Sequence, residues 1–62
     1  MQQLAEEYLH SAELLDQRIR QLRGSLDQLY GKEYLHALRR IDLLRQDYYE
    51  TRAVGLYLLR HS

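Results

Sequence analysis

Two Glu-x-x-His motifs, Glu7/His10 and Glu33/His36, have the residue types and spacing best suited to a chemical role in this chain. The same i, i+3 spacing carries ligands of the di-iron sites in ferritin-like helical bundles. In the heptad register described below, however, all four side chains fall outside the helix–helix seam. An antiparallel pairing also places the two motifs at opposite ends. We therefore expect solvated helix surface here, with no metal site and no cofactor.

Nucleophilic catalysis finds no better support in the sequence. The hydroxyl groups of Ser11, Ser25, Thr51 and Ser62 have no histidine and carboxylate arranged around them in a recognisable pattern. The chain also lacks cysteine, phosphate-binding loops, dinucleotide fingerprints and zinc-ligand spacings. We expect that the protein is not an enzyme.

Arginine supplies eight of the nine basic residues, and its guanidinium group suits phosphate contacts and interface ion pairs. In a hairpin folded near Gly31, facing residues have numbers that sum to about 62, which gathers arginines near the turn. Such a cluster is a candidate footprint for RNA or DNA, with Tyr30 and Tyr34 able to stack on bases. Interleaved acidic residues can pair with the same bases, so nucleic-acid binding is our alternative prediction. Its candidate residues are Arg18, Arg20, Arg23, Arg39, Arg40 and Arg45.

The elements that must position these side chains follow from a heptad pattern. Its first part has eight a and d slots, none of them charged: Ala5, Tyr8, Ala12, Leu15, Ile19, Leu22, Leu26 and Leu29. A sustained pattern of this kind is typical of a helix that packs on other helices in a coiled coil. Gly24 and Ser25 lie at outer positions, so we expect one helix over residues 3–30.

Gly31 is the expected turn, because glycine commonly follows the last core residue of a helix. A second helix is predicted over residues 32–60, with core slots at Tyr34, Ala37, Ile41, Leu44, Tyr48, Thr51, Gly55 and Leu58. Its apolar surface is broader than that of the first helix. One partner helix cannot cover a face that wide, so a second contact surface is implied.

The fold class we predict is all-α: one domain over residues 1–62, forming an antiparallel two-helix hairpin. A chain of this length buries little surface alone, so we expect a homodimer that forms a four-helix bundle. A further protein partner is also expected. The candidate residues for the oligomer or partner interface are Leu35, Tyr49, Val54, Leu56, Tyr57 and Leu59.

Localisation is inferred from charge and apolar runs. The net charge is zero, which gives no general attraction to anionic membranes. The longest apolar run, residues 53–59, is far too short to span a bilayer, and no secretory signal is visible. We expect a cytoplasmic protein without membrane contact.

One stretch also resembles a known family. Glu7-Tyr8-Leu9 with Leu15-Asp16-Gln17-Arg18-Ile19 is similar to the N-terminal helix of sigma-factor-like regulators of Gram-positive phages, and Lys32-Glu33-Tyr34-Leu35 with Arg40-Ile41-Asp42 resembles the same opening. In that family a coiled-coil-like region precedes a helix-turn-helix, which this sequence lacks. The resemblance therefore implies a phage or mobile-element origin and a role near transcription, and the family's DNA-binding activity is not carried over. We expect a small, non-catalytic interaction or regulatory protein.

Overall fold

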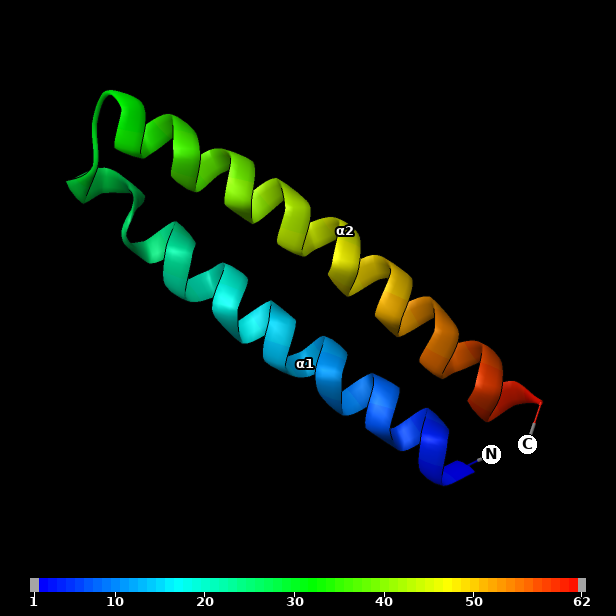
Figure 1. Ribbon diagram of the computed structural model, residues 1–62. Coiled ribbons are helices and arrows are strands. Elements are labelled where there is room, and N and C mark those ends of the chain that lie inside the picture. The colour runs from blue at the N-terminus through cyan, green and yellow to red at the C-terminus, as the bar shows by residue number, and fades with distance from the viewer. Residues whose placement is uncertain (1, 62) are drawn as a thin grey trace.

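Two long helices pack against each other in an antiparallel hairpin (Figure 1). The structure, a computed structural model, describes residues 2–61. Helix α1 spans Gln2–Gly24, a short 3-10 helix η1 spans Leu26–Gln28, and α2 spans Lys32–Arg60. Residues 2–61 contain no strand. The prediction of an all-α hairpin is confirmed.

The core is a single seam between α1 and α2. Its buried residues are Ala5, Ala12 and Ile19 on α1, and Ile41, Gly55 and Leu58 on α2. All six occupy a or d slots of the heptad pattern. Only Tyr8 and Tyr34, among the sixteen slots, count as exposed, at 37% each. The spacing of apolar residues therefore identifies which side of each helix faces the other.

Helix α1 ends at Gly24, so the prediction of one helix over residues 3–30 is wrong. Glycine and serine are both poorer helix formers than alanine. Here the Ser25 backbone N–H donates to the Leu22 carbonyl at 3.2 Å, and its hydroxyl donates to the Gln21 carbonyl, also at 3.2 Å. These bonds tighten the last turn into 3-10 geometry and satisfy carbonyls that a continuing helix would have used.

Gly31 forms the sharp part of the connection. Its φ of 66° and ψ of −138° lie in a region of backbone conformation that residues with a Cβ atom rarely adopt. Gly31 then serves as the N-cap of α2, where its carbonyl accepts the first backbone bond, from the Leu35 N–H at 3.3 Å. The prediction of a turn around Gly31 is therefore confirmed.

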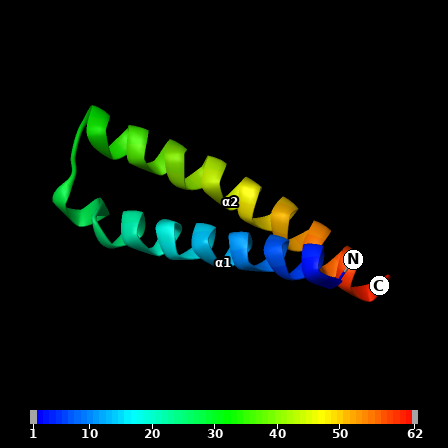
Figure 2. The ribbon, with the colours of Figure 1, turned by 60° about the horizontal axis from the view of Figure 1, so that its bottom comes forward.

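The two helices are closest at the end that carries the chain termini and diverge toward the turn (Figure 2). Small residues explain the close end: a Cβ added to Gly55 would lie 2.8 Å from Leu9 Cδ2 and 3.2 Å from the Leu9 backbone nitrogen. This contact also sets the register, with facing residues that sum to about 64 rather than 62. Near the turn, Leu22, Ala37 and Leu44 are half-buried, as Leu15, Tyr48 and Thr51 are nearer the termini.

Candidate interaction surfaces

The heptad register divides the hairpin surface into two faces, one on each side of the seam. Positions c, d and g of both helices form what we call the Leu22 face, and positions a, b and e form what we call the Arg23 face. The apolar residues of the Leu22 face include Leu4, Tyr8, Leu15 and Leu22 on α1, with Ala37, Leu43, Leu44 and Val54 on α2, and its g positions also carry Arg18, Glu33, Arg40 and Asp47. Residues of the Arg23 face are Leu9, Asp16 and Arg23 on α1, with Leu38, Asp42, Arg45 and Tyr49 on α2.

A hollow on the Leu22 face lies near the turn and has a volume of about 600 Å³. We call it the turn groove. Its apolar lining comes from Leu22, Ala37, Leu43 and Leu44, while its polar lining comes from His36, Arg39 and Arg40. The groove thus combines an apolar floor with a basic rim, a composition that suits an apolar partner surface bearing acidic groups.

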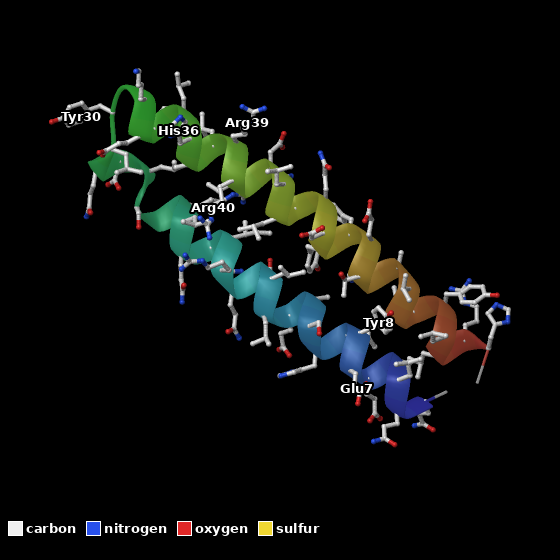
Figure 3. The ribbon with its side chains drawn as sticks, in the orientation of Figure 1. Glu7, Tyr8, Tyr30, His36, Arg39 and Arg40 are labelled. Carbon is white, nitrogen blue, oxygen red and sulfur yellow. The ribbon has the colours of Figure 1, made fainter. Side chains whose placement is uncertain are left out.

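A second, smaller hollow of about 300 Å³ lies on the same face near the chain termini. We call it the terminal groove. It is lined by Leu4, Glu7, Tyr8 and Ser11. The terminal groove therefore carries an acidic side chain, Glu7, whereas the turn groove carries basic ones. Figure 3 shows the two sets at opposite ends of the hairpin, with His36 and Arg40 near the turn and Glu7 and Tyr8 near the termini.

The Arg23 face has a different chemistry. Its groove near the turn, about 490 Å³, is lined by Arg23, Leu26, Leu38, Arg39, Ile41, Asp42 and Arg45. Further along the same side, Asp16 lines a hollow with Arg23 and Arg45. Charges of both signs thus lie directly beside the seam on this face. Burial of these groups in an interface would carry a large desolvation cost.

The six arginines proposed for nucleic-acid binding do not form one cluster. Arg23, Arg39 and Arg45 share the groove of the Arg23 face, but Arg40 lines the turn groove on the opposite side of the seam. The other two bond within α1: an Arg20 Nη2 lies 3.1 Å from an Asp16 carboxylate oxygen, and the Arg18 guanidinium donates to the Gln21 side chain at 3.4 Å. The arginines therefore divide between the faces, with Arg20, Arg23 and Arg45 on the Arg23 face, Arg18 and Arg40 on the Leu22 face, and Arg39 lining a groove on each side.

The six residues predicted for an oligomer or partner interface are all exposed, with exposed fractions between 38% and 63%. Their register splits them between the faces. Leu35, Tyr49, Leu56 and Leu59 lie on the side of the Arg23 face, whereas Val54 and Tyr57 lie on the side of the Leu22 face. Both tyrosines of this set have ring neighbours: Tyr49 meets Tyr48 edge to face at 5.2 Å, and Tyr57 meets His61 at 4.4 Å between centroids.

The Glu-x-x-His motifs are exposed and far apart in the structure. Glu7 and His10 belong to the terminal end of α1, whereas Glu33 and His36 belong to the first turns of α2. His10 instead lies 3.9 Å from the Glu13 carboxylate, its i, i+3 neighbour. No three histidine or carboxylate side chains come together as metal ligands in the part of the chain that the structure describes.

Sequence reasoning missed the charge polarity of the folded hairpin. Asp16 and Tyr48 share a hollow midway along the seam, so residues 17–47 form the half nearer the turn. That half carries seven basic and four acidic side chains, whereas the other half carries two basic and five acidic ones. The halves thus bear net charges of +3 and −3. The signal was present in the sequence, but it emerges only when charges are counted along the hairpin rather than along the chain.

Comparison with known protein families, with characterised proteins and with solved structures finds no match for this chain. The resemblance to phage sigma-factor-like regulators therefore stays a prediction. Across residues 2–61, neither helix combines the length and the apolar character that crossing a bilayer requires.

Proposed function

We propose that this protein is a small, non-catalytic interaction or regulatory module that works as a homodimer. Two hairpins together form a four-helix bundle, and the helix faces that remain outside the dimer contact a protein partner. The exposed Leu35, Tyr49 and Leu56 on the outer side of α2 supply apolar surface for that partner.

The surface area of the single hairpin is the observation that carries this proposal. It exposes 5152 Å², whereas a folded monomer of 7.5 kDa is expected to expose about 4250 Å². The excess of about 900 Å² is close to the roughly 800 Å² that each partner contributes to a stable interface. A second copy of the same chain carries the same excess surface, so the pairing of two copies needs no further gene.

The solution mass of the protein tests the dimer. We expect sedimentation equilibrium or light scattering at micromolar concentration to give twice the chain mass of 7.5 kDa, with circular dichroism showing high helix content. A helical species with the mass of one chain would overturn the proposal, because the excess surface would then be tolerated in water.

The regulatory part of the proposal depends on the resemblance of the Glu7-Tyr8-Leu9 and Lys32-Glu33-Tyr34-Leu35 segments to phage regulators. We propose an origin in a phage or another mobile element. The position of the gene tests this: neighbouring phage or transposition genes would support it, and a setting among housekeeping genes in related genomes would contradict it.

Nucleic-acid binding is the second candidate function, because Arg23, Arg39 and Arg45 line one groove of the Arg23 face. Asp42 lines the same groove and weakens its attraction for phosphate. The test is a gel-shift series with RNA and with duplex DNA at low and at moderate salt. A salt-sensitive shift that Arg39→Ala and Arg45→Ala abolish would favour this function. Absence of any shift at low salt would remove it.

A further inference from the structure

We propose that the two copies pair through their Leu22 faces with their turns at opposite ends, so that the terminal half of each copy covers the turn groove of the other. This inference rests on the proposed homodimer and specifies its face and its direction. Three features of the hairpin point to the same arrangement.

The shape of the hairpin is the first feature. Small residues bring the helices together at the terminal end, where Leu9 contacts Gly55, and the helices diverge toward the turn (Figure 2). Each hairpin is therefore a wedge. Two wedges packed in the same direction would place both wide ends together and leave both turn grooves open. Packed in opposite directions, the narrow end of each lies against the wide end of the other, which improves the packing density of the combined core.

The charge distribution is the second feature. Because the halves of each hairpin carry +3 and −3, parallel pairing brings like charges together at both ends. Antiparallel pairing brings each basic half against an acidic half. The electrostatic interaction between the two copies is therefore repulsive along the bundle in parallel pairing and attractive in antiparallel pairing, which favours the antiparallel arrangement.

The third feature is the match between the two grooves of the Leu22 face. The turn groove has an apolar floor with Arg40 at its rim, and the terminal groove contributes Leu4 and Tyr8 beside Glu7. With a rise of about 1.5 Å per residue, Arg40 lies about 12 Å from the midpoint on the turn side, and Glu7 about 13 Å from it on the other side. A two-fold axis through the midpoint packs α1 on α1 and α2 on α2, and it brings Arg40 of one copy and Glu7 of the other to the same level of the bundle on diagonally opposite helices.

The choice of face follows from desolvation. Both faces carry charges beside the seam, but the turn groove of the Leu22 face has four apolar residues in its lining. The groove near the turn on the Arg23 face is lined mainly by charged side chains, those of Arg23, Arg39, Asp42 and Arg45. Covering the turn groove removes mainly apolar surface from water, which is favourable. Covering the Arg23 face would bury these charges at a large cost. The Arg23 face therefore stays outside the dimer.

The direction of pairing is measured by the distance between the two turns. The chain has no native cysteine, so a spin label on Tyr30→Cys reports a single site, and the 86% exposure of Tyr30 makes the substitution harmless to packing. In the proposed dimer the label-to-label distance is close to the 47 Å length of the hairpin. Parallel pairing would instead place the labels within about 20 Å of each other, since packed helices lie about 10 Å apart.

A label on Gln17→Cys, exposed near the midpoint of α1, serves as the matched control. Its distance to the equivalent label is about the width of the bundle in either arrangement, so it reports only that a dimer exists. A dimer signal from Gln17→Cys with a short distance from Tyr30→Cys overturns the antiparallel arrangement alone. No dipolar signal from either site overturns the homodimer itself.

A charge reversal tests the face. We expect Arg40→Glu to weaken dimerisation about tenfold, because it replaces a basic group at the rim of the turn groove with an acidic group that faces the acidic half of the partner. Arg45→Glu makes the same change on the Arg23 face, one turn further along α2, and should leave the dimer dissociation constant within about twofold. Sedimentation equilibrium measures both. If Arg40→Glu strengthens the dimer, pairing is parallel, and if Arg45→Glu has the larger effect, the face is wrong.

Discussion

At the scale of the single residue, Gly55 sets how closely the two helices approach. Leucine is a far better helix former than glycine, and this substitution would stabilise an isolated helix by about 0.8 kcal/mol. Here the first side-chain carbon would meet Leu9 Cδ2 at 2.8 Å and the Leu9 backbone nitrogen at 3.2 Å. We therefore predict that Gly55→Leu lowers the free energy of unfolding by about 2 kcal/mol, as overpacked cores do. Urea unfolding followed by circular dichroism measures this at fixed protein concentration.

The matched control for Gly55→Leu is Gly24→Leu at the end of α1, where an added Cβ meets no atom within 4 Å. We expect that variant to be neutral or slightly stabilised. Equal effects at the two glycines would show that helix propensity alone decides the outcome, and that the close contact between Leu9 and Gly55 does not exist in solution.

The positions of buried residues could be read from the sequence because burial follows periodicity. Ile19 and Ile41 are buried, as their slots require, and so are Ala12 and Leu58. What periodicity could not supply is the distance between the helices. That distance depends on the sizes of the residues that happen to face each other, such as Leu9 against Gly55. The wedge shape and the turn groove follow from it, so both were invisible before the structure.

At the scale of the element, the connection between α1 and α2 shows that a pattern of buried residues is not a pattern of backbone bonds. Leu26 and Leu29 continue the heptad spacing and are half-buried, yet Leu26 lies in η1 and Leu29 in extended backbone. The spacing predicted which side chains face inward, and it wrongly extended α1 to Tyr30. The hydrogen bonds of Ser25 that end α1 depend on local geometry, which a heptad count does not contain.

The connection yields a prediction about its glycine. Gly31 has a φ of 66° and a ψ of −138°, a combination that costs a residue with a Cβ about 2 kcal/mol. We expect Gly31→Ala to lower the free energy of unfolding by about that amount. Gly24→Ala should raise it by roughly 0.5–1 kcal/mol, because Gly24 is helical and open. Thermal unfolding of both variants at one concentration compares them, and a neutral Gly31→Ala would mean that the turn adopts another conformation.

At the scale of the whole molecule, the opposite charges of the two hairpin halves make the dimer sensitive to salt. Raising NaCl from about 0.02 M to about 0.5 M shortens the Debye length from about 20 Å to about 4 Å. Attraction between the basic half of one copy and the acidic half of the other is then screened over most of the interface. We predict that the dimer dissociation constant rises about tenfold or more across this range, as measured by sedimentation equilibrium.

The direction of the salt effect carries the argument, because hydrophobic burial responds in the opposite sense. Salt does not weaken apolar contacts such as those of the turn groove, and it can strengthen them. Parallel pairing would place like charges together, and salt would then favour association by screening their repulsion. A neutral pair of surfaces would show little change. Loss of the dimer on adding salt, with helix content retained at low protein concentration, therefore requires opposite charges to face each other across the interface. A dimer that tightens with salt would contradict the pairing of basic with acidic halves, whatever its shape.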